Sequence, residues 1–118
     1  MKARIHTQAY TLTSSIQYWI DRQVERNLQR FEGEVLAVEV YLSDLNGPRG
    51  GDDNRVVMRA SLRGLPSVTV ITDHQDLYVA VSRSARRLQR AVKRSLRKSR
   101  RVEPRKVLAL RRQTPEMV

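Results

Sequence analysis

The chain has 118 residues, which predicts one domain, and 40% of them are apolar, which is too many for a fully disordered chain. Its formal net charge is +11 at pH 7. It contains no Cys, which excludes disulfide scaffolds, thiolate nucleophiles and Cys-ligated zinc. No apolar stretch approaches the roughly 20 residues that a membrane span needs. Met1 is not followed by the apolar run of a signal peptide, so we expect a cytoplasmic protein.

The charge is concentrated at one end of the chain. Residues 1–81 hold nine Lys or Arg and ten Asp or Glu, a net charge of −1. Residues 82–118 hold fourteen Lys or Arg and two acids, a net charge of +12. This asymmetry indicates a polyanionic partner, either a nucleic acid or an anionic membrane surface.

The first two predicted elements are a strand and a helix. Alternation over residues 2–8 places Ala3 and Ile5 on one side of a short strand. Thr13 is expected to cap a helix, because its hydroxyl can accept a hydrogen bond from a free backbone N–H group. Gly33 is expected to end that helix. The apolar side chains of this helix recur at steps of three and four: Ile16, Trp19, Ile20, Val24, Leu28 and Phe31.

Three further strands are predicted, over residues 35–43, 55–63 and 67–72, because apolar and polar residues alternate in each. Residues 44–54 are rich in Gly, Asp and Asn and are expected to form a loop. A turn is predicted over residues 64–66, which contain Gly and Pro.

The last predicted element is a long helix from about His74 to about Arg101, with Asp73 as its N-cap. The element order then predicts an α+β domain, a β-α-β-β-β-α two-layer sandwich in which two helices cover one face of a four-stranded sheet. We expect residues 1–101 to form this domain and residues 102–118 to be a basic, extended or disordered tail.

The long helix has two opposite faces. Its apolar face contains Leu77, Val81, Ala85, Leu88, Val92 and Leu96. The other face presents cations over roughly 27 Å, and such a row matches the phosphate backbone of a nucleic acid. The residues predicted to bind RNA are Arg83, Arg86, Arg87, Arg90, Lys93, Arg94, Arg97, Lys98 and Arg101.

The composition of the basic face favours structured RNA. Most of its cations are Arg, whose planar guanidinium matches phosphate and can stack on bases. Gln89 is the only amide between Arg83 and Arg101, so we expect recognition by shape and backbone rather than by sequence. A membrane-surface helix is disfavoured, because its apolar face would have to meet lipid and is needed here to cover the sheet.

Few residues in the sequence suggest catalysis. The two histidines, His6 and His74, are expected at a strand and beside a helix cap, and Asp52 and Asp53 lie in loop composition. The Gly-rich segment 46–51 lacks the spacing and the Lys-Ser/Thr pair of a phosphate-binding loop. We therefore expect the protein not to be an enzyme and to bind no metal, cofactor or small-molecule substrate. A small ribonuclease using His6 or His74 is the enzymatic alternative.

The start of the long helix resembles a family signature. Residues 76–81 (DLYVAV), followed by Arg87-Leu88-Gln89-Arg90 and Arg94, are similar to the "D-hydrophobic-Y-A-A-I … K-L-x-R-Q-x-x-K" motif of the ribosome hibernation-promoting factors and ribosome-associated translation inhibitors. The resemblance covers about residues 1–100. It implies a β-α-β-β-β-α fold that binds rRNA of the small ribosomal subunit and blocks the mRNA and tRNA channel of idle ribosomes under stress. By position, it assigns the family's basic residues to Arg87, Arg90 and Arg94.

Two other interpretations of the function stay open. A double-stranded-RNA-binding module has a similar core, but its second helix should open with a basic cluster, whereas this one opens with Asp73-His74-Gln75-Asp76. A structural ribosomal protein would bind permanently rather than reversibly. The 17 residues after Arg101 are too few for the dimerisation domain of the long family members. We therefore expect no direct role in joining two ribosomes through such a domain. We also expect the free protein to be a monomer.

Overall fold

The computed structural model describes residues 2–8, 11–45 and 53–113, with side chains described as far as Ser99. Its elements follow the predicted order, with one short 3-10 turn added after the first helix. They are β1 (Arg4–Gln8), α1 (Ser14–Leu28), η1 (Gln29–Phe31), β2 (Val35–Asp44), β3 (Asn54–Leu62), β4 (Leu65–His74) and α2 (Leu77–Gln113).

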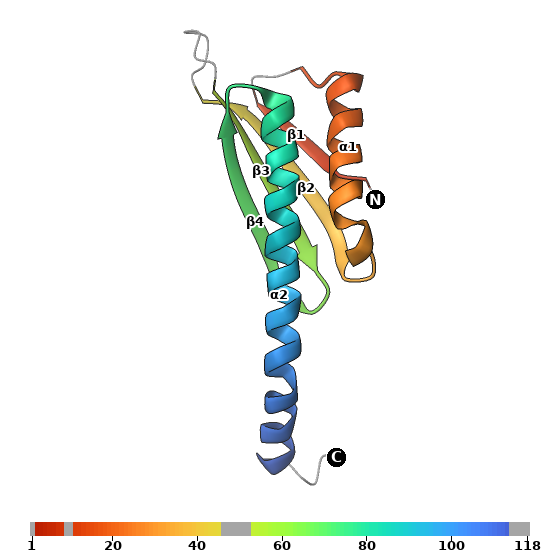
Figure 1. Cartoon of the computed structure of the whole chain (residues 1–118), viewed down its shortest axis with the longest axis vertical. Helices are drawn as coiled ribbons and strands as arrows, with labels where there is room; N and C mark the ends of the chain where they lie inside the picture. Colours follow the sequence, from red (N-terminus) through yellow and green to blue (C-terminus); the bar gives the residue numbers. More distant parts are fainter. Residues whose placement is uncertain (1, 9–10, 46–52, 114–118) are drawn as a thin grey trace.

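The strands form one mixed sheet in the order β1-β2-β3-β4. β1 is parallel to β2 across the α1 crossover, and the other two pairs are antiparallel. In register, Ile5 lies opposite Val40, Val40 opposite Met58, and Met58 opposite Val70. Figure 1 shows α1 and α2 side by side over the same face of this sheet. The predicted two-layer α+β architecture is therefore confirmed.

The β3–β4 hairpin turns through two residues, because Leu62 and Leu65 still face each other in the ladder. Gly64 has φ of 71°, in the left-handed region that residues with a Cβ atom rarely adopt. A glycine at this position therefore allows the tight turn that brings β4 back beside β3.

The core lies between the sheet and the helices. Both helices contribute the apolar faces that periodicity predicts, and Ile20, Val24, Leu88 and Val92 are all 0% exposed. Burying these faces fixes the rotation of each helix, so the remaining side of α2 must face solvent. The buried apolar residues are Ile20, Val24, Leu28, Val35, Val38, Val40, Leu42, Val56, Met58, Ala60, Leu62, Ala80, Val81, Ala85, Leu88 and Val92.

The N-cap of α1 is confirmed, because the Thr13 hydroxyl accepts a hydrogen bond of 3.2 Å from the backbone N–H of Ile16. α1 itself ends at Leu28, and the 3-10 turn continues the chain to Phe31. Gly33 follows that turn, so α1 ends earlier than predicted and the chain continues to Phe31 as a 3-10 turn, which is frequent at the ends of α-helices.

The predicted cap of the second helix is wrong. β4 continues to His74, and Asp73 is a strand residue held by the side chain of Arg55, its partner in the ladder. Asp76 caps α2 instead, since its Oδ1 accepts hydrogen bonds from the backbone N–H groups of Tyr78 (2.9 Å) and Val79 (3.4 Å). The cross-strand pairing with Arg55 explains why Asp73 is kept in the strand.

α2 is also longer than predicted. Its end was expected near Arg101, but the helix continues to Gln113. Residues 102–113 consist mostly of good helix formers, although Pro104 opposes a helix by about 3 kcal/mol when it lies in the interior. The division into a domain at 1–101 and a basic segment after it stays a prediction. Residues 114–118, and residues 46–52 of the predicted loop, lie outside the described residues.

Candidate nucleic-acid interface

The basic face of α2 lies opposite its buried face. Ala80, Val81, Ser84, Ala85 and Leu88 are 0–1% exposed, which turns the intervening positions towards solvent. From Arg83 to Lys98 the face extends over about 22 Å at the helical rise of 1.5 Å per residue. The exposed cations are Arg83, Arg86, Arg87, Arg90, Arg94, Arg97 and Lys98, whereas Lys93 is half-buried. The side chain of Arg101 lies outside the described part of the chain.

The described cations of α2 form no ion pair with a described acid. Among the described side chains, the ion pairs are His6 with Glu39 and Arg55 with Asp73, and all four residues belong to the sheet. No described carboxylate lies within 4.0 Å of a described α2 cation. Like charges three and four residues apart repel each other by a few tenths of a kcal/mol per pair. A polyanion bound along α2 would remove this repulsion.

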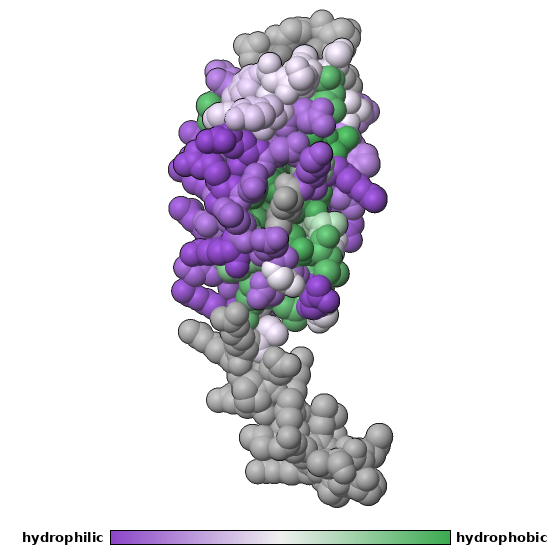
Figure 2. All heavy atoms as spheres, turned by 90° about the vertical axis from the view of Figure 1, so that its right-hand side faces the viewer, coloured by the Kyte–Doolittle hydropathy of each residue, from purple (hydrophilic) through white to green (hydrophobic). Residues whose placement is uncertain are grey.

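The outer face of the sheet differs, because both ion pairs among the described side chains lie there. Glu39 accepts a hydrogen bond of 2.8 Å from the Tyr41 hydroxyl and lies 3.3 Å from His6 Nε2. The Tyr41 hydrogen bond is the main cause that holds the pKa of Glu39 below its ordinary value of 4.5. Arg55 and Asp73 form a bidentate pair on the same face. The described cations without an ion pair are most numerous on the helical layer, and Figure 2 shows hydrophilic residues gathered on its left, where that layer lies.

Arg87 differs from the other predicted RNA-binding residues. Its Nη1 donates a hydrogen bond of 3.0 Å to the carbonyl oxygen of Ile71, and it lies 3.4 Å from Thr72 Oγ1. The contact ties α2 to β4. A guanidinium has five N–H groups, so Arg87 can hold this contact and still present donors to a phosphate.

The structure adds Arg30 to the basic surface, a residue that sequence reasoning missed. Arg30 belongs to η1 and lines a pocket together with Lys93 and Arg97 of α2. It follows Arg22 and Arg26 at steps of four, and all three are exposed. That spacing was visible in the sequence, but the acids that alternate with it, such as Glu25, hid the signal.

The candidate catalytic histidines have structural contacts. His6 stacks on the Tyr41 ring, with 4.7 Å between centroids and 14° between planes. His74 Nδ1 accepts a hydrogen bond of 2.9 Å from the backbone N–H of Asp76 at the start of α2. Within the described residues, no group of three or more His, Cys, Asp or Glu side chains could hold a metal ion. Asp52 lies outside those residues.

The fold and the basic helix define a class of protein: a small α+β domain with one exposed cationic helix face. Residues 3–100 match the model of the sigma 54 modulation protein / S30EA ribosomal protein family, and the chain belongs to this family. The match confirms the resemblance predicted from the sequence. Membership places the chain among ribosome-associated proteins.

Two solved structures share the fold. The N-terminal domain of Protein Y from Thermus thermophilus is 26% identical, with a TM-score of 0.66 over 80% of this chain and 98% of that one. A ribosomal subunit interface protein from Coxiella burnetii is 14% identical, with a TM-score of 0.66 over 79% of this chain and 96% of that one. The comparison with curated proteins gives no match. In the part of the chain that the structure describes, no helix is long and apolar enough to cross a membrane.

Proposed function

We propose that the protein binds rRNA of the small ribosomal subunit through the basic face of α2 and blocks the mRNA and tRNA channel of idle ribosomes. The observation that carries the proposal is the row of exposed α2 cations with no described carboxylate within ion-pair distance. Membership of a ribosomal protein family supports the ribosome as the binding partner.

The chemistry of this face suits a folded RNA groove. Guanidinium groups on a rigid helix can contact successive phosphates without first ordering a flexible segment. Such contacts fix position and orientation and read no sequence, which matches an RNA target defined by shape. The buried apolar face of α2 keeps the cations in place, because rotating the helix would expose Leu88 and Val92.

A protein of this kind acts by occupancy rather than by catalysis. It would bind reversibly, as a monomer in the cytoplasm, and inhibit translation in proportion to the ribosomes it occupies. tRNA, mRNA and initiation factors would displace it, since ligands that share one site compete by mass action.

Cell-free translation titrated with the protein tests this mechanism. We expect inhibition to saturate near one copy per ribosome and to be relieved by added tRNA or initiation factors. Inhibition at a small fraction of one copy per ribosome would indicate turnover, and cleaved rRNA would then identify a ribonuclease.

Sedimentation of a lysate separates the proposal from its structural alternative. A reversible inhibitor should accompany small subunits or idle ribosomes and leave them when translation resumes. A permanent ribosomal protein would sediment with ribosomes from growing and resting cells alike, and that result would overturn the proposal.

A further inference from the structure

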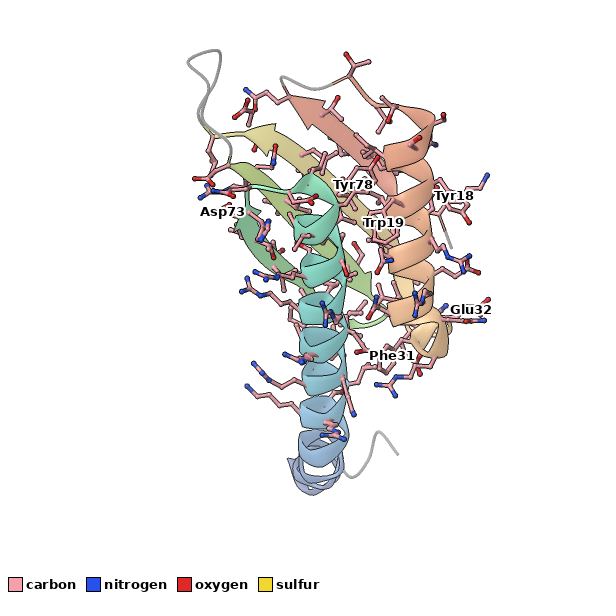
Figure 3. The ribbon with its side chains drawn as sticks, turned by 45° about the horizontal axis from the view of Figure 1, so that its top comes forward. Tyr18, Trp19, Phe31, Glu32, Asp73 and Tyr78 are labelled. Carbon is pink, nitrogen blue, oxygen red and sulfur yellow. The ribbon has the colours of Figure 1, made fainter. Side chains whose placement is uncertain are left out.

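A pocket lies between η1 and the middle of α2. Its cavity volume is about 280 Å³, and it is lined by Arg30, Phe31, Glu34, Lys93, Leu96 and Arg97. Figure 3 shows Phe31 between the foot of α1 and α2, with Glu32 directed away from α2. The volume is just below the roughly 300–1,000 Å³ of sites for drug-sized ligands, so the pocket suits one small chemical group.

The floor of the pocket is apolar and its rim is cationic. Phe31 and Leu96 are partly buried and pack against the core. The Arg30 guanidinium lies over the Phe31 ring, 4.9 Å from its centroid. Lys93 and Arg97 complete the rim, and no described carboxylate forms an ion pair with any of the three cations.

One acidic residue, Glu34, also lines the pocket, and its backbone is fixed. The N–H of Glu34 donates a hydrogen bond of 2.9 Å to the Phe31 carbonyl, and its own carbonyl accepts one of 2.8 Å from the Arg63 N–H. Glu34 is half-buried, and its side chain makes no hydrogen bond or ion pair with the described residues. The pocket lining therefore includes a carboxylate that no described protein group pairs with.

We infer that this pocket binds an unpaired guanine nucleotide of RNA. Unstacked bases commonly stack on aromatic rings or guanidinium planes, and the Arg30 guanidinium, which lies over the Phe31 ring, supplies such a plane. Lys93 and Arg97 would contact the phosphate. Guanine is the RNA base with two adjacent donors, N1–H and the N2 amino group, and these match the two oxygens of the Glu34 carboxylate.

The inference deepens the proposed function and rests on it, because the pocket opens beside the basic face. Lys93 and Arg97 belong both to the predicted RNA-binding residues and to the pocket lining. A strand of RNA held along α2 would therefore pass the pocket mouth. The basic face would supply affinity without sequence, and the pocket would supply the preference for one base.

NMR titration of the full chain with the four ribonucleoside 5′-monophosphates tests the pocket. We expect the GMP complex to be at least fivefold tighter than those of AMP, CMP and UMP, with shifts centred on Phe31, Glu34 and Leu96. Glu34→Gln should abolish the preference, because an amide replaces one acceptor by a donor. Glu32→Gln, a neighbouring exposed carboxylate outside the pocket, is the matched control and should leave the preference unchanged.

Phe31→Leu keeps apolar volume while removing the ring, and should weaken GMP at least threefold without removing the preference for it. Equal affinities for the four nucleotides, or a preference that survives Glu34→Gln, would overturn the inference. If the wild-type protein inhibits translation but has no base preference, the inference of a guanine-binding pocket is overturned and the proposed function is not. If the protein prefers guanine but does not inhibit translation, the proposed function is overturned and the pocket inference is not.

Discussion

The Arg87 guanidinium donates a hydrogen bond of 3.0 Å to the carbonyl oxygen of Ile71, and this contact joins the basic helix to the edge strand β4. Arg87 is thus a surface cation with a structural role, whereas no comparable contact is found for Arg90 among the described residues. The two arginines lie on the same face of α2 but should respond differently to substitution.

Arg87→Gln should lower the free energy of unfolding by about 0.5–1 kcal/mol, the net contribution of one ordinary hydrogen bond. Arg90→Gln should leave it within about 0.5 kcal/mol, as is usual for an exposed residue without contacts. Urea unfolding followed by the fluorescence of Trp19 measures both. Equal stabilities of the two variants would show that the Ile71 contact contributes nothing.

Leu88 should be structural rather than functional, because it is 0% exposed beneath the basic face. Leu88→Ala should lower the free energy of unfolding by roughly 2–4 kcal/mol by leaving a cavity between α2 and the sheet. Leu36→Ala is the control, since Leu36 is 58% exposed and its loss should cost under about 0.5 kcal/mol. An unchanged melting temperature together with lost ribosome binding would mean that the faces of α2 are assigned the wrong way round.

The N-cap of α2 gives a third prediction. Asp76→Ala removes the acceptor for the N–H groups of Tyr78 and Val79 and should cost about 1 kcal/mol. Asp76→Asn keeps an acceptor oxygen and should recover most of that loss. Thermal unfolding measures the difference, and equal losses in both variants would argue against the cap.

The pair of Arg55 and Asp73 should make stability depend on pH in the acid range. The Arg55 hydrogen bonds hold the pKa of Asp73 below its ordinary value of 3.8 in the folded protein. Because the folded pKa is the lower one, the stabilisation is complete well above pH 3.8 and disappears as the pH falls through the folded value. Melting temperatures from pH 6 to pH 2 should therefore fall less steeply for Asp73→Asn than for the wild type, and parallel curves would exclude the effect.

Periodicity alone predicted the element order and both helix faces, because burial requires a repeating apolar pattern within each element. The Thr13 cap could also be predicted, because its hydrogen bond is local and joins residues only three apart in the sequence. Contacts across elements had no local signal. Because Asp73 pairs with Arg55 in the sheet, Asp76 and not Asp73 caps α2. The pocket lined by Arg30 and Arg97 forms between η1 and α2, which are distant in the sequence.

If the basic face of α2 binds ribosomal RNA, the affinity for ribosomes should depend strongly on salt. With six to eight phosphates neutralised, log K should fall against log salt with a slope of roughly −4 to −7. The double variant Arg90→Gln/Arg94→Gln should bind about tenfold more weakly, with a slope shallower by about 1.5. The matched double variant Arg4→Gln/Arg59→Gln, on the outer face of the sheet, should change neither. A slope near zero would mean that phosphate contacts do not supply the affinity. Equal losses from the two double variants would mean that the basic face of α2 is not the RNA-binding surface.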